Sequence, residues 1–280
     1  MVGSRERRVN ARLDELLAWT LARQARPGDV LVVGVATPIA TAAAFLARTL
    51  LVPDLTILLG TAVNPALADL SEAMLAPERL GRMAEGHFSQ LEILDFIHKG
   101  EVSLQYISPA QVDGRGRINS SRVRNGDRWV RLPGGLATAD IAVLVGRLVA
   151  YRADHSPRFL TPAVDFVSGV GADPQWRTED CLPGRGVEAI VTSRAVLAWT
   201  GTGFRVASVH PGHTRHEVLD GCGFPLQADS APPSTPPPPT EALELCRRVI
   251  DPRGLGRLEV RHLRAQALDE LTAAHGPGDG

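Results

Sequence analysis

Apolar runs of strand length, separated by helical segments, constrain the fold of this chain more than any other feature of its sequence. Residues 29–34 (DVLVVG) and 54–59 (DLTILL) are continuous apolar runs, and a third strand is predicted at 102–107. A helix over 39–50 and a Ser89–Glu92 capping box lie between these strands. Strands that are apolar at nearly every position are typical of a parallel sheet, because helices cover both of its faces. The sequence therefore predicts an α/β fold, an open three-layer α/β/α sandwich with a mostly parallel sheet.

The second half of the chain is less regular. We predict strands at 145–151, 164–167, 187–192 and 205–209 and helices at 214–220 and 241–250. Seven prolines between 225 and 239 exclude a regular element and indicate a stiff, extended connector. We expect a single domain over residues 1–265, with this connector inside it. A C-terminal tail over 266–280 is predicted to begin as a helix and to end as a flexible segment.

Composition and charge exclude several classes of protein. With 44% hydrophobic residues, 22% charged residues and a net charge of −1, the chain is an ordinary globular protein without a nucleic-acid footprint. Its basic charge is almost wholly arginine, with Lys99 the only lysine, which we interpret as coding bias rather than as a binding patch. No apolar run approaches the roughly 18 residues of a membrane span. Three unpatterned cysteines and the lack of a secretory signal favour the cytoplasm.

Two adjacent glycines, Gly134 and Gly135, follow a predicted strand and precede a short helix. Paired glycines let the backbone approach a ligand closely, because no side chain intervenes. Free N–H groups at the start of the next helix favour an anion or a developing oxyanion. We predict that both glycines donate hydrogen bonds to a ligand oxygen.

Other polar residues allow a functional and a structural interpretation. Gln111, Asp113 and Asn119 lie in a loop between predicted strands, where they either face a ligand or stabilise turns. His155 either acts as a general base or packs as a structural histidine, and the structural interpretation is favoured. The pair Glu85 and His87 is interpreted as part of a surface loop rather than as an acid/base pair.

No cofactor or metal is expected. His210, His213 and His216 recur at intervals of three, but Pro211-Gly212 interrupts any helix that would place them on one face, so no metal site is predicted. The glycine pattern after the first strand is not a dinucleotide fingerprint, and no phosphate-binding loop is present. We infer neither NAD nor ATP.

Short motifs spread over most of the chain, in a consistent order, resemble those of one family. They are GVATP (34–38), PDLT (53–56), FSQL (88–91), QVD (111–113) with Gly116 and Asn119, the Gly134-Gly135 loop, VDFVSG (164–169), HPG (210–212) and IDP (250–252). In this order they resemble the β subunit of family I CoA-transferases of the glutaconate type. The chain looks more similar still to the β subunit of the cholesterol ring-cleaving hydrolase branch.

The resemblance implies an α-type partner subunit, in an α2β2 heterotetramer, and an acyl-CoA thioester site between the subunits. Coenzyme A would be bound as a substrate and not as a covalently held cofactor, and neither nucleic acid nor membrane is implied as a partner. Gly34, Thr37, Gln111, Asp113, Arg117 and Asn119 are the positions implied for substrate or CoA. Arg117 replaces a residue that is often asparagine, and it either meets a substrate carboxylate or is solvated, the second being favoured.

The resemblance also shows what this chain lacks. Transferase β subunits carry a nucleophilic glutamate just after the second strand, where this chain has Gly60-Thr61. Covalent catalysis needs that nucleophile. We therefore expect non-transfer chemistry on an acyl-CoA, either hydrolytic C–C cleavage or decarboxylation. Two alternatives stay open, namely a true CoA-transferase whose nucleophile lies on the partner, and a non-catalytic structural subunit.

Overall fold

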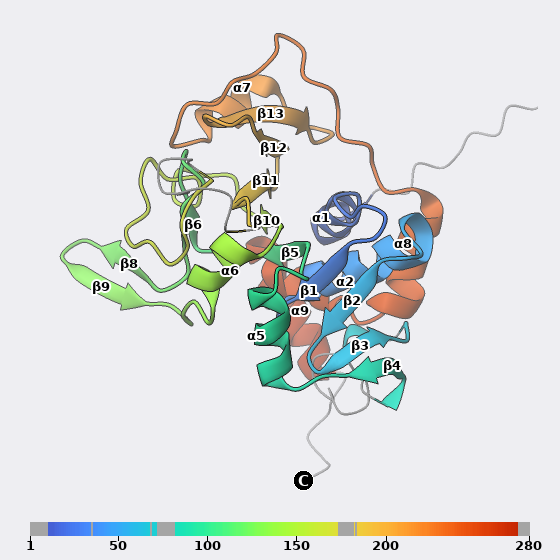
Figure 1. The fold of residues 1–280 in the computed structure, drawn as a ribbon. Coiled ribbons are helices and arrows are strands. Elements are labelled where there is room, and N and C mark those ends of the chain that lie inside the picture. The colour runs from blue at the N-terminus through green and yellow to red at the C-terminus, as the bar shows by residue number, and fades with distance from the viewer. Residues whose placement is uncertain are drawn as a thin grey trace, which may run out of the picture.

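The computed structural model describes residues 11–34, 36–67, 69–71, 82–172, 182 and 184–273. Its centre is a nine-stranded sheet with the strand order β13-β12-β11-β10-β5-β1-β2-β3-β4 (Figure 1). The strands are β1 (Val30–Val33), β2 (Thr56–Leu59), β3 (Ala62–Pro65), β4 (Ala84–His87), β5 (Leu104–Ile107), β10 (Arg147–Tyr151), β11 (Val187–Val191), β12 (Ala195–Trp199) and β13 (Phe204–Val209).

The five central strands, β11, β10, β5, β1 and β2, pair in parallel, and both edges of the sheet are antiparallel. The predicted α/β sandwich is thus confirmed, and its parallel part is the centre rather than the whole sheet. Two small ribbons lie outside the main sheet. They are β6 (Gln111–Val112) with β7 (Ile118–Asn119) and β8 (Arg122–Asn125) with β9 (Arg128–Arg131).

Side chains alternate between two cores along the central strands. In β1, Leu31 and Val33 belong to one apolar core, whereas Val32 packs against the other. In β10, Val149 and Tyr151 face the first core and Leu148 faces the second. Successive side chains of a strand point to opposite faces, so apolar runs of this kind bury both faces. This is why 29–34 and 54–59 could be recognised as buried strands.

Helices cover both faces of the sheet. They are α1 (Leu13–Ala22), α2 (Pro38–Leu46) with its π-helical extension (Ala47–Leu51), α5 (Gln90–His98), α6 (Thr138–Leu144), α7 (Arg215–Asp220), α8 (Thr240–Leu245) with a π-helical extension (Cys246–Ile250), a 3-10 turn (Leu255–Glu259) and α9 (Arg261–Ala273). Helices α1, α2, α8 and α9 contribute to the first core, and α5, α6 and α7 to the second. None of the described helices is long and apolar enough to span a bilayer.

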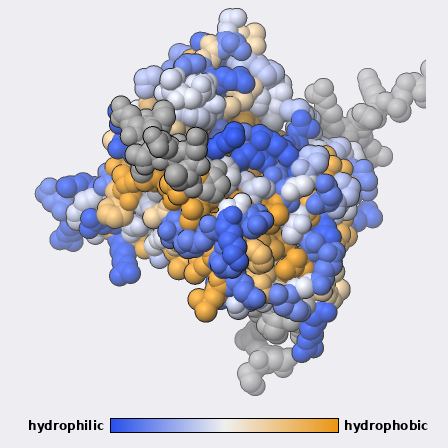
Figure 2. All heavy atoms as spheres, in the orientation of Figure 1, coloured by the Kyte–Doolittle hydropathy of each residue, from blue (hydrophilic) through white to orange (hydrophobic). Residues whose placement is uncertain are grey.

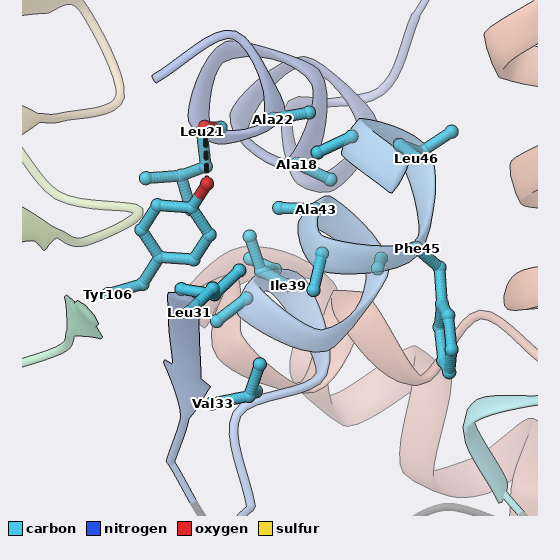
Figure 3. Close-up of a cluster of buried hydrophobic side chains, with 14 of the residues drawn as sticks. Ala18, Leu21, Ala22, Leu31, Val33, Ile39, Ala43, Phe45, Leu46 and Tyr106 are labelled. Atoms are coloured by element: carbon cyan, nitrogen blue, oxygen red, sulfur yellow. Dashed lines mark hydrogen bonds between the residues drawn. The ribbon is translucent and has the colours of Figure 1, made fainter. Parts of the chain in front are cut away.

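Helices α1 and α2 pack against each other and against β1 in the first core. Figure 3 shows Leu21 and Ala22 of α1 against Ala43 of α2, with Leu31 beneath them. Small alanines let the two helices approach closely. Tyr106 of β5 reaches into this layer, and its hydroxyl donates to the Leu21 carbonyl at 2.9 Å, which satisfies a polar group in an apolar core.

Several predicted elements are confirmed, and one is wrong. The strands at 145–151, 187–192 and 205–209, the helices at 214–220 and 241–250 and the capping box at Ser89 all form. Residues 164–167 form no strand. Their backbone is held by side chains instead, because the amide of Asp165 donates to Gln111 Oε1 at 3.0 Å. Strand β12 was not predicted.

The proline-rich connector runs beside β13 as an extended chain. It touches that edge strand at two isolated bridges, Arg205 with Gln227 and Val209 with Ser234. Prolines cannot donate to a ladder, so a continuous strand cannot form there. Further on, helix α9 crosses the boundary predicted at residue 265 and ends at Ala273. The helical start of the tail is confirmed, and residues 274–280 lie outside the described part of the chain.

Candidate functional site

The carboxyl ends of the parallel strands bring two of the predicted segments together. Val33 pairs with Leu59 in the register of β1 and β2, so Gly34 and Gly60 follow on neighbouring strands. Helix α2 begins at Pro38, four residues after Gly34. Helix α5 begins near Thr61, whose carbonyl accepts the Phe88 amide at 3.0 Å. In open α/β sheets, ligands bind at this edge. Gly34, Thr37, Gly60 and Thr61 are therefore one group in space.

The turn at Gly60 is open. Gly60 has φ +64°, in the left-handed region, and a Cβ built on it would have no atom within 4 Å. Both Gly60 and Thr61 are exposed. An L side chain here would be strained by the backbone rather than by crowding. The position that the resemblance assigns to a nucleophilic glutamate is thus a glycine turn with free space above it.

A half-buried carboxylate that sequence reasoning missed lies at the start of α2. Glu259, on the 3-10 turn, accepts the Ile39 amide at 2.9 Å and the Tyr151 hydroxyl at 2.9 Å. Thr37 does not cap the helix, since its hydroxyl donates to the Gly34 carbonyl at 2.7 Å. The N-terminus of α2 would otherwise attract an anionic ligand, but the Glu259 carboxylate already binds there.

Burial makes this carboxylate easier to protonate. Loss of solvent raises the pKa of Glu259 to about 6, against the lowering effect of its bonds to Ile39 and Tyr151. Arg152, which donates to the Pro109 carbonyl at 2.9 Å, is a neighbouring cation at the same edge of the sheet. No local sequence signal marks Glu259, because only the tertiary fold places it under α2.

In the Gly134-Gly135 loop, both backbone amides were predicted to donate to a ligand, and the Gly134 amide is not free to do so. The Gly134 amide donates to the Ser120 carbonyl at 3.0 Å, so this N–H is already bonded and the prediction that it serves a ligand is corrected. Gly134 has φ +111°, and a Cβ on Gly135 would lie 2.8 Å from Thr138 Oγ1. Both glycines are thus required by the turn into α6. The Thr138 amide is also bonded, to the Gly135 carbonyl at 3.0 Å, so the amides of Gly135, Ala139 and Asp140 remain as candidate donors.

Gln111, Asp113, Arg117 and Asn119 come together, but as internal scaffold. Asn119 Nδ2 donates to Gln111 Oε1 at 2.7 Å. Asp113, fully buried, accepts the amides of Arg115 and Arg117 and pairs with the Arg117 guanidinium at 2.6 Å. Arg117 is therefore neither a solvated residue nor a free partner for a substrate carboxylate. Of the two interpretations, the structure supports turn chemistry, because the polar groups satisfy one another.

His155 is a structural residue and not a general base. It is 4% exposed, with Nδ1 2.7 Å from Thr192 Oγ1 and Nε2 2.8 Å from the Val218 carbonyl. Both ring nitrogens are engaged inside the protein, so the contacts support the structural interpretation that the sequence favoured and leave no nitrogen free for the catalytic one. His210 is buried in the same way between Thr235 and the Thr192 carbonyl, whereas exposed His216 pairs with Asp220. The histidines face different surroundings.

These buried histidines predict acid sensitivity. Burial lowers the pKa of His210 to about 4 from 6.5 and also lowers the pKa of His155. Between these values the unfolded chain binds a proton that the folded chain does not, so stability falls as pH falls from 6.5 to about 4. His210 alone contributes up to about 3 kcal/mol to the change. Glu259, whose pKa is raised from 4.5 to about 6, opposes this loss between those two values, because there the folded chain binds the extra proton.

Urea unfolding across this pH range tests the effect. In His210→Asn, which cannot titrate, the free energy of unfolding should depend less steeply on pH than in the unchanged protein. Equal slopes in the two proteins would assign the acid sensitivity to other groups.

Glu85 and His87 lie on edge strand β4 rather than in a loop. Glu85 pairs with Arg48 at 2.7 Å and accepts Asn64 Nδ2 at 2.8 Å, and these hydrogen bonds lower its pKa. It is thus a structural anion of this sheet edge. A separate shallow pocket, lined by Thr240, Leu243, Glu244, Arg247 and Arg248 on α8 and its extension, contains none of the candidate residues. No cluster of metal-binding side chains occurs among the described residues.

Known proteins resemble the chain over most of its length. The B subunit of 3-oxoadipate CoA-transferase from Pseudomonas knackmussii is 27% identical over 241 residues, covering 84% of this chain and 91% of that one. The B subunit of glutaconate CoA-transferase from Acidaminococcus fermentans is 27% identical over 256 residues, with 85% and 92% covered. The cholesterol ring-cleaving hydrolase IpdB subunit of Mycobacterium bovis is 27% identical over 253 residues, with 88% and 98% covered.

Solved structures agree on the fold. The decarboxylase AibA/AibB has a chain with a TM-score of 0.75 and 25% identity, covering 90% of this chain and 99% of that one. IpdAB of Rhodococcus jostii RHA1 gives a TM-score of 0.77 at 23% identity, with 90% and 99% covered. No family model matches the sequence.

The sheet, the glycine turns at its carboxyl edge and these likenesses define one class of protein, the CoA-transferase-like α/β subunits. Over most of its length the chain is similar to the B subunits of CoA-transferases and to the IpdB subunit, which agrees with the resemblance of its motifs. Transferases and the ring-cleaving hydrolase match at the same 27% identity, so overall similarity does not separate the chemistries.

Proposed function

We propose that this chain is the β subunit of a heteromeric enzyme that acts on an acyl-CoA thioester by chemistry other than CoA transfer. The observation that carries the proposal is the turn at Gly60, which offers open space in place of the transferase nucleophile. A glycine there leaves room for a bulkier acyl chain or for a water molecule.

Carboxylates on neighbouring elements do not replace the missing one. Glu85 is bound to Arg48 and Asn64, and Glu259 to Ile39 and Tyr151. Glu92, at the start of α5, accepts the Ser89 amide at 2.6 Å in the capping box. Each of these carboxylates is held by groups of its own, which favours a reaction without a glutamyl intermediate on this chain.

Backbone donors suit the alternative reactions. Decarboxylation and C–C cleavage of a CoA-bound acid both release an electron pair toward the thioester carbonyl, whose oxygen then carries negative charge. The amides of Gly135 and of Ala139 and Asp140 in the first turn of α6 would donate to this oxygen. Gly34, Thr37 and Thr61 would line the space beside it, and Gln111, Asp113, Arg117 and Asn119 would hold the loop in place.

A partner subunit would complete the site. AibA/AibB and IpdAB are named as pairs, and the two transferase relatives are each named as one subunit of an enzyme. We extend this to the present chain as an α-type partner in an α2β2 complex that works in the cytoplasm. The described carboxylates near this edge of the sheet are already bonded within the chain. The partner would therefore supply the catalytic acid or base.

A CoA-exchange assay tests the proposal. The reconstituted complex is incubated with an acyl-CoA and a labelled acceptor acid, with a 3-oxoadipate CoA-transferase as the positive control. We expect exchange at least about a hundredfold slower than in the control, because the covalent route is absent. Efficient exchange would contradict the non-transfer chemistry.

Trapping experiments separate the remaining alternatives. Borohydride or hydroxylamine treatment followed by peptide mapping would place a glutamyl-CoA adduct on the partner if the enzyme is a transferase with its nucleophile there. Gly135→Val should abolish turnover in an assembled complex, since its side chain would collide with Thr138. Unchanged turnover in this variant would favour a purely structural subunit.

A further inference from the structure

The ribbon of β8 and β9 projects from the body of the molecule beside α6 (Figure 1). Residues 115–131 contain six arginines and a single acid, Asp127. The projecting ribbon is largely hydrophilic on its visible surface (Figure 2). Its charge is therefore concentrated, although the chain as a whole carries a net charge of −1. Coding bias explains an excess of arginine over lysine, but not this clustering.

Strand register places three of these arginines on one face of the ribbon. Arg122 lies opposite Arg131, and Arg124 lies opposite Trp129. Opposite residues of an antiparallel pair, and residues two apart in one strand, share a face. Like charges directly opposite each other destabilise a ribbon unless an anion lies between or beside them. This face, defined by Arg122, Arg124, Trp129 and Arg131, is called the arginine face below.

Aromatic rings hold two of the guanidinium groups in place. The Arg122 guanidinium lies 4.6 Å from the centre of the Trp129 ring and 4.7 Å from that of Phe166. The Arg124 guanidinium lies 4.8 Å from the Trp129 ring. All four residues of the arginine face are exposed. Stacking orders these long side chains, so less entropy is lost when they bind a ligand.

The one described carboxylate that contacts the arginine face, that of Asp165, accepts the Arg124 backbone amide at 2.9 Å and not a guanidinium group. Elsewhere arginines pair with acids, as Arg26 does with Glu188, Arg147 with Asp29 and Arg257 with Glu270. Within the described ranges, the ion pairs include none with Arg122, Arg124 or Arg131. The face is thus complementary to an anion with several charges.

The ribbon is tied to the loop that precedes α6. The Leu132 amide donates to the Ser121 carbonyl at 2.9 Å, and the Gly134 amide donates to the Ser120 carbonyl at 3.0 Å. The arginine face therefore begins where the candidate thioester donors are located and extends outward from them. A ligand with its reacting group at the loop would carry any distant charged end along the ribbon.

We propose that the arginine face binds the phosphate groups at the nucleotide end of the CoA thioester. This inference rests on the proposed function, which supplies the ligand. CoA carries a 3′-phosphate and a diphosphate, and guanidinium groups bind phosphate oxygens in a bidentate fashion.

Binding of adenosine 3′,5′-bisphosphate and of CoA to the full chain tests the inference by calorimetry. The double variant Arg122→Gln, Arg124→Gln should bind both probes roughly tenfold or more weakly, since two charged contacts are lost. Arg128→Gln is the matched control, because Arg128 lies on the opposite face of the same ribbon. It should bind within about twofold of the unchanged chain.

Kinetics of the reconstituted complex separate this inference from the proposed function. The double variant should raise KM for the acyl-CoA and leave turnover of the corresponding acyl-pantetheine, which lacks the nucleotide, unchanged. If bisphosphate binding depends on Arg122 and Arg124 but no acyl-CoA is turned over, the proposed function fails and the binding face stands. Unchanged binding of the bisphosphate and of CoA in the double variant would overturn the inference. A double variant that binds both probes normally but no longer associates with the partner subunit would also overturn it.

Discussion

Replacing Asp29 with alanine is expected to lower the free energy of unfolding by about 3 kcal/mol or more. Asp29 lies 6% exposed at the start of β1, and its carboxylate binds the Arg147 guanidinium of β10. It also accepts the Ser103 hydroxyl at 2.7 Å and the Arg26 amide at 2.7 Å. Removing it leaves a buried cation and two further donors without their acceptor, which costs more than the ion pair itself contributes.

Chemical denaturation of the variant measures this cost. Asp54→Ala is the matched control, because exposed Asp54 makes one bond to the Gly28 amide in the neighbouring loop, and we expect it to cost at most about 1 kcal/mol. Asp29→Asn keeps hydrogen-bonding capacity and should lie between the two. If Asp29→Ala proves as stable as Asp54→Ala, then Glu188 and the Gln24 carbonyl, which also bind Arg147, are sufficient to stabilise its guanidinium without Asp29.

The second large effect is expected at Gly171. A Cβ on this residue would lie 2.0 Å from the Arg115 carbonyl oxygen and 3.1 Å from the Arg117 amide nitrogen. Both atoms belong to the turn that buried Asp113 fixes, so the backbone cannot yield without breaking those bonds. Gly171→Ala should therefore destabilise the protein by about 3 kcal/mol, at the upper end for overpacking.

Gly203→Ala supplies the comparison for this substitution. A Cβ on Gly203 would meet no atom within 4 Å, and its φ is not in the left-handed region. The free energy of unfolding of Gly203→Ala should lie within about 0.5 kcal/mol of that of the unchanged protein, so its midpoint of thermal unfolding should shift little. If both alanine variants melt alike, the turn at 113–117 is softer than its hydrogen bonds indicate.

Much of the fold follows from local sequence rules. Apolar runs marked β1 and β2, the Ser89–Glu92 capping box marked the start of α5, and clustered prolines marked the connector. The failure at 164–167 has a physical reason, since a β-branched, apolar segment there is held by the side chains of Gln111 and Asp113 and not by a neighbouring strand. Propensity cannot foresee a partner that is distant in sequence.

The candidate site divides in the same way. Motif order identified Gly60 and Gly135, because a backbone turn is encoded locally by the residues that permit it. It could not show that the Gly134 amide is already bonded, nor that His155 is enclosed between Thr192 and Val218. Each of those contacts joins segments that the sequence does not relate.

The sequence by itself determined the class of fold, the resemblance to CoA-transferase β subunits and the absence of a glutamate at residues 60–61, since these depend on the order and chemistry of short segments. Only the tertiary structure decided which polar residues are free to act. Folding placed Glu259 beneath α2, 220 residues from Ile39, and set Arg122 beside Arg131 on one face. Such roles depend on burial, which sets the free-energy cost of a charged group, and on long-range pairing, which decides whether a polar group still has a free donor or acceptor.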